Sequence, residues 1–175
     1  RKSIKWGVLG VGAAGSKLAE VFYNFGYETV VMNTAVQDLE GIKIPEENKL
    51  HTEFGLNGAG KSLEIGEAAA SRYKDELFER VKLKMPNAQA LIYCLSLGGG
   101  SGAGSLMPVV ETLNAVGLPI VVVAVLPMDS EDAGTKSNSI ETLAKLSRLV
   151  QEKKVQSVIC ADNARIETIY KDVGQ

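Results

Sequence analysis

The stretch Gly98-Gly99-Gly100-Ser101-Gly102-Ala103-Gly104-Ser105 decides the fold, because it stands between an apolar run at residues 90–95 and a helical-looking run at residues 106–116. Five glycines in eight residues let the backbone approach a bulky anion, and the N-terminus of the following helix aims N–H groups at it. A flexible Gly/Ser linker is the other interpretation, but linkers rarely stand directly between a buried strand and an amphipathic helix. The stretch therefore predicts a phosphate cradle at the end of a strand.

Composition narrows the classes of protein that the sequence can encode. A length of 175 residues with 45% hydrophobic residues fits one globular domain with a sizeable core. The 19 basic residues against 21 acidic ones give a net charge of −2, which offers no overall attraction for nucleic acid or an anionic membrane. No run approaches the roughly 18 apolar residues of a membrane span, and residues 1–6 lack a signal peptide's apolar core. Cys94 and Cys160 lie in apolar runs without CxxC spacing, so we expect core thiols of a cytoplasmic protein.

Strands and helices alternate along the chain. The patterns predict strands near residues 5–9, 28–32, 90–97, 119–126 and 156–161, and helices near 16–25, 63–84, 103–116, 135–152 and 164–172. Residues 37–54 are predicted to form a long polar surface excursion with room for one short helix, on which His51 is solvated and carries no chemistry. This order predicts an α/β fold, a Rossmann-like parallel sheet with helices on both faces, whose ligand binds at the carboxyl ends of the strands.

A second glycine turn, Gly10-Val11-Gly12-Ala13-Ala14-Gly15, follows the first predicted strand and matches GxGxxG. This is the fingerprint of a NAD-type oxidoreductase, which needs an Asp or Glu at the end of the second strand. Here that strand ends in Met32-Asn33-Thr34, and a dinucleotide fold leaves residues 98–105 unexplained. The NAD-type enzyme and a non-catalytic Rossmann-like binding module remain the alternatives.

A third stretch, Gly55-Leu56-Asn57-Gly58-Ala59-Gly60-Lys61-Ser62, matches the P-loop pattern GxxxxGK[ST]. A P-loop must leave a buried strand directly, whereas residues 48–54 look too polar to form one. We therefore interpret the match as a chance occurrence in glycine-rich sequence.

Taken together, the loops resemble those of the tubulin superfamily, which includes the division protein FtsZ and the segregation proteins called TubZ. Residues 98–105 are similar to the family's GGGTGTG(S) phosphate loop, and residues 10–15 to its first phosphate loop. The segment Asn33-Thr34-Ala35-Val36-Gln37 resembles NTDAQ, and Asn57-Gly58-Ala59-Gly60 resembles the loop that senses the γ-phosphate. The opening Trp6-Gly7-Val8-Leu9-Gly10 looks more like TubZ than FtsZ.

The resemblance implies a guanine-nucleotide site that holds GTP or GDP with Mg²⁺ and has no metal cluster of its own. Residues 127–131 resemble the sugar-contacting loop, Asn163 falls where the family reads the guanine edge, and Thr135 replaces an Arg of FtsZ. The implied binding residues are Gly10, Gly12, Ala13, Ala14, Gly15, Asn33, Gly58, Ala59, Gly60, Gly98, Gly99, Gly100, Ser101, Gly102, Ala103, Gly104, Glu131 and Asn163.

Several of these residues also have a local structural interpretation. Ser101 and Ser105 suit helix N-caps as well as hydroxyl donors, and Asn163 suits the N-cap of the last predicted helix. Asn33 suits either the base pocket or a turn. Lys17 and Lys61 are the only cations near the loops, so backbone N–H groups and Mg²⁺ must supply most of the phosphate binding.

The resemblance also implies how hydrolysis is divided between subunits. Residues 1–175 correspond to a single GTP-binding domain, the N-terminal half of the family's proteins, and the C-terminal half carries the catalytic acid into the next subunit's site. We therefore assign no catalytic residue here. We expect a GTPase and a homopolymer, serving DNA segregation or cell division, from the full-length parent, and binding with hardly any hydrolysis from this chain.

Overall fold

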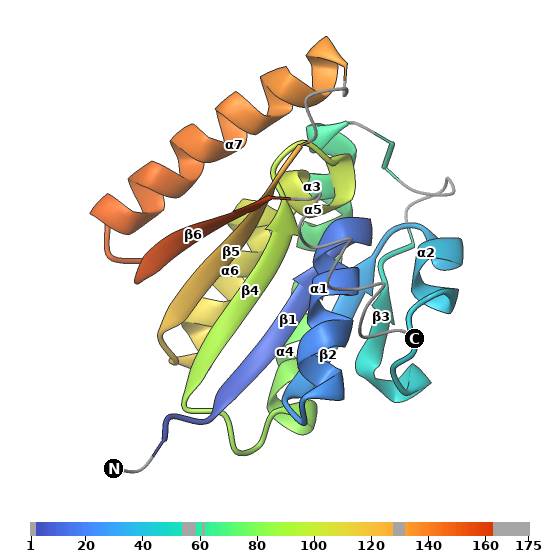
Figure 1. Ribbon diagram of the computed structural model, residues 1–175, viewed down its shortest axis with the longest axis vertical. Coiled ribbons are helices and arrows are strands. Elements are labelled where there is room, and N and C mark those ends of the chain that lie inside the picture. Colours follow the sequence, from blue (N-terminus) through green and yellow to red (C-terminus); the bar gives the residue numbers. More distant parts are fainter. Residues whose placement is uncertain (1–2, 54–58, 61, 128–131, 163–175) are drawn as a thin grey trace.

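A parallel sheet of six strands forms the centre of the computed structural model, which describes residues 3–53, 59–60, 62–127 and 132–162. The strand order is β3-β2-β1-β4-β5-β6 (Figure 1). The strands are β1 (Trp6–Val11), β2 (Glu28–Asn33), β3 (Lys49–His51), β4 (Ala90–Ser96), β5 (Ile120–Leu126) and β6 (Ser157–Asp162). The chain passes from the edge strand β3 to β4 beside β1, where Val11 is in register with Leu95. The topological switch point, where open α/β sheets bind ligands, therefore lies between the ends of β1 and β4.

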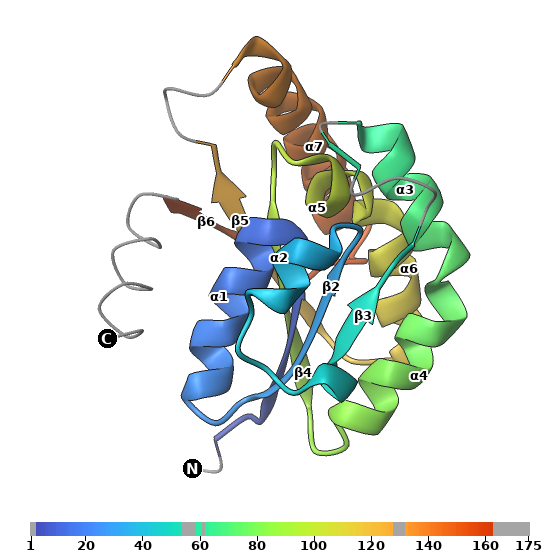
Figure 2. The ribbon, with the colours of Figure 1, turned by 90° about the vertical axis from the view of Figure 1, so that its right-hand side faces the viewer.

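Helices cover both faces of the sheet, as the alternating pattern predicted (Figure 2). One face carries α1 (Gly12–Asn24) and α2 (Val36–Glu40), and the other carries α3 (Leu63–Arg72), α4 (Lys74–Lys84), α6 (Leu106–Val116) and α7 (Ala133–Gln151). The short helix α5 (Gly100–Gly104) stands at the carboxyl end of β4, and a 3₁₀ turn, η1 (Glu46–Asn48), precedes β3. Among the described residues, no helix is both long and apolar enough to cross a bilayer.

The two cores explain why the central strands are apolar over most of their length. In β4, Leu91, Tyr93 and Leu95 are buried with α4 and α6, whereas Cys94 is buried with α1 on the opposite face. A strand covered on both sides has no solvent face to carry polar residues. The predicted α/β fold is thus confirmed.

The predicted single helix at residues 63–84 is wrong in one respect, because it breaks at Tyr73, where φ is −106° and ψ is 16°. The two halves have different partners: α3 packs against α5, and α4 packs against α6. Gly66 of α3 lies so close to the Gly100 carbonyl that a side chain has no room there. The break lets each half approach its own neighbour.

The predicted helix at residues 103–116 also breaks, at Ser105, and its first turn begins earlier than expected, at Gly100. Pro108 lies four residues after Gly104, so it cannot donate to that carbonyl and its ring crowds it. The Ser105 hydroxyl donates instead to the Gly102 carbonyl over 2.8 Å. The glycine stretch therefore forms a separate helical turn rather than an open loop.

Residues 37–54 contain a strand that the polar composition did not predict. Besides α2 and η1, they form β3, in which Leu50 pairs with Met32 and is buried. The ammonium of the buried Lys49 pairs with Glu46 over 2.8 Å, so an edge strand tolerates this lysine. The expectation that residues 48–54 form no strand is therefore wrong, although β3 is a short edge strand that ends at His51 and does not lead directly into the P-loop pattern at Gly55.

Two further expectations about single residues are corrected. His51 is part of β3 rather than a solvated loop, and its Nε2 lies 3.0 Å from the Thr34 carbonyl oxygen. Cys160 is exposed on the edge strand β6, whereas Cys94 in the central strand is buried as expected. An apolar pattern does not distinguish an edge strand from a central one, because burial depends on the neighbouring strands.

Candidate functional site

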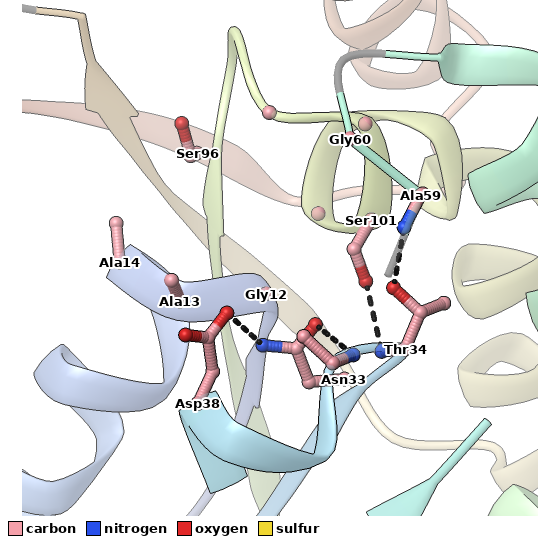
Figure 3. A pocket seen from close by; sticks show the side chains of 14 residues that line it. Gly12, Ala13, Ala14, Asn33, Thr34, Asp38, Ala59, Gly60, Ser96 and Ser101 are labelled. Carbon is pink, nitrogen blue, oxygen red and sulfur yellow. Dashed lines mark hydrogen bonds between the residues drawn. The ribbon is translucent and has the colours of Figure 1, made fainter. Parts of the chain in front are cut away.

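A cavity of about 410 Å³ opens at the carboxyl ends of β1, β2 and β4 (Figure 3). It lies at the switch point of the sheet, and its size is within the usual range for small-molecule sites. Its walls are formed by Gly12, Ala13, Ala14, Asn33, Thr34, Ala35, Asp38, Ala59, Gly60, Ser96, Gly99, Gly100, Ser101 and Gly102. Ten of these fourteen were predicted, and four were not: Thr34, Ala35, Asp38 and Ser96.

The two glycine turns meet in the cavity. Gly12 has a left-handed backbone, with φ of +79°, and a Cβ there would lie 3.0 Å from the Gly102 nitrogen. Helix α1 begins at Gly12 and has no side-chain N-cap, so its first N–H groups are available to an anion. Ala13 and Ala14 are small enough to leave that helix end open to the cavity.

The other predicted members of the two turns lie behind the cavity wall. Gly10, Gly15, Gly98, Ala103 and Gly104 do not line it. A Cβ at Gly15 would collide with the Cys94 carbonyl, one at Gly98 with Thr135, and one at Gly104 with the Leu63 carbonyl. These glycines let helices and strands pack closely, and this packing brings the two turns together.

The short helix α5 also presents its first turn to the cavity. The first-turn N–H groups of a helix have no partner within the helix, and Gly99 at the N-cap offers no side chain to satisfy them. The Gly100 N–H donates to the Gly60 carbonyl over 3.1 Å. The Ser101 hydroxyl accepts from the Thr34 N–H over 3.3 Å, whereas Ser105 is buried and turned toward the Gly102 carbonyl. Only the first of these serines therefore reaches the cavity.

Asn33 lines the cavity but its amide serves the turn after β2. Its Oδ1 accepts from the Ala35 N–H and its Nδ2 donates to Asp38 Oδ2, both over 3.2 Å. Asp38, which the sequence analysis missed, is the one ionisable side chain among the described residues that line the cavity. The dinucleotide fingerprint expects an acid at the end of β2, whereas Asp38 lies in α2, just after that strand.

Thr34 joins the turn to the Ala59–Gly60 segment. It is 3% exposed, and its Oγ1 accepts from the Ala59 N–H over 3.0 Å. Gly60 has φ of +57° and, with Ala59, forms part of the cavity wall (Figure 3). Ser96, at the end of β4, also lines the cavity.

Three predicted site residues, Gly58, Glu131 and Asn163, lie outside the described residues, as do Lys61 and the predicted last helix. The sugar and base contacts therefore remain predictions. In the part of the chain that the structure describes, no group of three or more His, Cys, Asp or Glu residues could hold a metal ion.

Beneath the cavity, two ionisable groups are held neutral. Burial raises the pKa of the Cys94 thiol, and burial likewise raises the pKa of the Tyr93 phenol, with the Ser105 hydroxyl opposing that effect. Neither side chain lines the cavity. They are buried on opposite faces of β4, Tyr93 in the core under α4 and α6 and Cys94 in the core under α1.

Comparisons with known proteins agree with this geometry. Residues 5–171 match the model of the Tubulin/FtsZ family, GTPase domain. The TubZ protein of Bacillus cereus is 26% identical over 182 residues, covering 97% of this chain and 41% of that protein. The FtsZ protein of Aquifex aeolicus (strain VF5) is 32% identical over 144 residues, covering 79% of this chain and 38% of FtsZ.

A solved structure extends the likeness to the fold. The GTPγS-form protofilament of TubZ from Bacillus thuringiensis serovar israelensis superposes with a TM-score of 0.80 at 24% identity, over 97% of this chain and 50% of that one. The chain thus spans half the length, or less, of each of these three proteins.

Proposed function

The chain belongs to the tubulin/FtsZ family, and from that premise we propose that it binds GTP and GDP, with Mg²⁺, in the cavity between its two glycine turns. The family inferred from the loops is confirmed. The observation that carries the ligand proposal is the contact of Gly12 with Gly102, which leaves backbone N–H groups of two helix ends facing one cavity. Such a surface suits a chain of phosphates, because side chains would hold the amides away from it.

The residues present fit a magnesium ion. A nucleotide triphosphate carries several negative charges, and the described residues that line the cavity include no cationic side chain. They include instead one carboxylate, Asp38, which would repel the phosphates unless a cation lay between them. Mg²⁺ commonly binds one or two carboxylates together with phosphate oxygens, and would here neutralise both. Asp38 is the side chain that would hold it, and Asn33 orients that carboxylate.

The finer assignments follow from the family. We assign the ribose contact to Glu131 and the guanine edge to Asn163, and the phosphates to the two turns and to residues 58–60. The family's GTPase-domain description supports guanine over adenine, and a NAD-linked oxidoreductase is not favoured.

The whole protein's behaviour is a further part of the proposal. We propose a cytoplasmic homopolymer whose assembly drives GTP hydrolysis, in plasmid partition or cell division, by analogy with the TubZ protofilament and with FtsZ. Both cysteines are free, as in proteins of reducing compartments. We propose no direct contact with nucleic acid or membrane.

Ligand identity is tested by thermal unfolding with equal concentrations of GTP, GDP, ATP and NAD, each with Mg²⁺. We expect GTP and GDP to raise Tm by several degrees, since a ligand stabilises the fold according to its affinity. Equal shifts with ATP and GTP would overturn the guanine assignment. Acid release and chromatography of any co-purified nucleotide give an independent identification.

The role of Asp38 is tested by the variant Asp38→Asn, with Glu40→Gln as the matched control, because Glu40 lies on the same helix but does not line the cavity. We expect the GTP affinity of Asp38→Asn to depend less on Mg²⁺ than that of the unchanged protein. In EDTA, the variant should bind GTP more tightly than the unchanged protein, because the carboxylate that repels the phosphates is gone. A Mg²⁺ dependence equal to that of the control would exclude Asp38 from the cation site.

Hydrolysis is tested by phosphate release against protein concentration. Within the described residues, the one carboxylate that lines the cavity is Asp38, and the proposal gives it to the cation. We therefore expect the 175-residue chain to bind GTP but release phosphate slowly, at a rate per subunit that does not change with concentration. A rate that rises steeply above a threshold concentration would show assembly with catalysis and overturn this expectation.

A further inference from the structure

Thr34 connects three segments that are far apart in the sequence. Its N–H donates to the Ser101 hydroxyl over 3.3 Å, its Oγ1 accepts from the Ala59 N–H over 3.0 Å, and its carbonyl lies 3.0 Å from His51 Nε2. Figure 3 shows Ser101 and Ala59 approaching Thr34 from one side of the cavity. Each polar group of this buried residue thus has a partner from a different element.

The Ala59–Gly60 segment is held to the cradle at two points. Gly60 is held directly, because its carbonyl accepts from the Gly100 N–H over 3.1 Å. Ala59 is held through Thr34, whose own N–H reaches Ser101 in the first turn of α5. The segment then leads into α3, since the Ser62 N–H donates to the Ala59 carbonyl over 3.1 Å and Ser62 caps that helix.

The two attachments place Ala59 and Gly60 across the cavity from the start of α1. Figure 3 shows Ala13 and Ala14 on one side and Ala59 and Gly60 on the other. A phosphate chain bound at the two glycine turns would have this wall in front of it. A longer chain would come nearer to the wall, so its binding would depend more on how firmly the wall is fixed.

We propose that Thr34 is a positioning residue: its hydroxyl fixes the Ala59–Gly60 wall against the cradle, and thereby sets the preference of the site for a nucleoside triphosphate over a diphosphate. The proposal rests on the proposed function for its ligand. The two hydrogen bonds of Thr34, to Ala59 and to Ser101, form a clamp that is present in the protein without nucleotide. Loss of the hydroxyl leaves the buried Ala59 N–H without its acceptor, which favours release of the wall.

The test compares Thr34→Val, which keeps the shape and removes the acceptor, with Thr34→Ser, which keeps the hydroxyl. Thr112→Val is the matched control, because Thr112 is also buried and its hydroxyl donates to the Pro108 carbonyl over 2.8 Å, within α6 and away from the cavity. Should Thr34→Val not fold, Thr34→Ala removes the same acceptor with less bulk.

Two measurements are made on each protein: the affinities for GTP and GDP with Mg²⁺, and the hydrogen exchange of the Ala59 amide without nucleotide. For Thr34→Val we expect the ratio of GTP to GDP affinity to fall about tenfold and the Ala59 amide to exchange about tenfold faster, the scale of one buried hydrogen bond. Thr34→Ser should keep the affinity ratio and the exchange rate of the unchanged protein, and so should Thr112→Val.

Equal losses of GTP and GDP affinity in Thr34→Val, or failure of the serine to restore the ratio, would overturn the positioning role. Unchanged exchange of the Ala59 amide would overturn the clamp itself. If the unchanged protein bound neither nucleotide, the proposed function would fail and the phosphate preference with it, while the exchange measurement would still decide whether the clamp exists.

Discussion

The glycine turn after β1 and the glycine turn after β4 perform the same two tasks with different surroundings. In the first, Gly12 lines the cavity while Gly10 and Gly15 pack α1 against the sheet. In the second, residues 99–102 line the cavity while Gly98 and Gly104 pack against α7 and α3.

The difference lies in what surrounds each turn. The atoms around Gly10 and Gly15 belong to α1 and the central strand β4. Those around Gly98, Gly100 and Gly104 belong to α7, to α3 and to the segment before α3, whereas Gly99 and Gly102 meet the ends of β1 and β4. The first turn is therefore packed within the core, and much of the second is packed against segments outside the sheet. Substitutions in the first should affect folding, and substitutions in the second should affect binding.

The largest effect is expected at Gly15. A side chain there meets the carbonyl of Cys94 in the central strand, and backbone cannot move aside cheaply. We expect Gly15→Val to lose at least about 4 kcal/mol of unfolding free energy in urea titrations, which prevents folding of a marginally stable domain. The control is Gly41→Ala, whose Cβ meets nothing closer than the Asp38 carbonyl at 3.7 Å, and which should stay within about 0.5 kcal/mol. A stable Gly15→Val protein would show that the first glycine turn is not tightly packed in the core.

At Gly102 the expected loss is in binding. A Cβ there lies 3.0 Å from the Val11 carbonyl, a contact that small shifts relieve, so we expect a stability cost of about 1–2 kcal/mol. Gly102→Val and Gly102→Asp should nevertheless bind GTP at least about 100-fold more weakly in calorimetry, because the backbone can no longer approach the phosphates. Gly117→Ala, which is strained by a φ of +86° but is remote from the cavity, should lose stability without losing binding. Binding that survives both changes would show that the cradle lies elsewhere.

A smaller effect is expected at Gly60, on the wall opposite α1. Its φ of +57° makes alanine unfavourable by about 1 kcal/mol, with no steric clash. We expect Gly60→Ala to weaken GTP binding several-fold more than GDP binding. Gly26→Ala, at a φ of +91° and away from the cavity, should affect neither nucleotide. Identical effects of Gly60→Ala on the two nucleotides would remove its part in sensing the last phosphate.

The smallest effect concerns the two cysteines and reports on the first turn. The thiolate is the reactive form, and burial raises the pKa of Cys94, so this thiol should stay unlabelled at pH 8 while the exposed Cys160 reacts. The labelling of each thiol is measured by peptide mass spectrometry. Equal labelling rates of the two thiols in the unchanged protein would contradict the burial of Cys94.

Local sequence patterns predicted most strands and helices of this fold, but they missed an edge strand, helix breaks and some residues of the cavity. Apolar runs identified β1, β2, β4 and β5, because a parallel strand covered on both faces is largely apolar, and they also identified the exposed edge strand β6. The edge strand β3 was missed because only Leu50 gives it an apolar character, and the break at Tyr73 was missed because it depends on which helices pack together. Asp38 was missed because a helical turn returns it to the cavity after the strand has ended.

The sequence by itself determined the alternation of strands and helices, the glycine turns at strand ends and the family, since each of these depends on residues that are close together in the sequence. Only the tertiary structure decided which glycines line the cavity and which pack the core. Those roles depend on contacts between distant residues, such as Gly12 with Gly102 and Gly15 with Cys94. A glycine needed for close packing and a glycine needed for a ligand look the same in a sequence, because both are defined by what approaches the missing side chain.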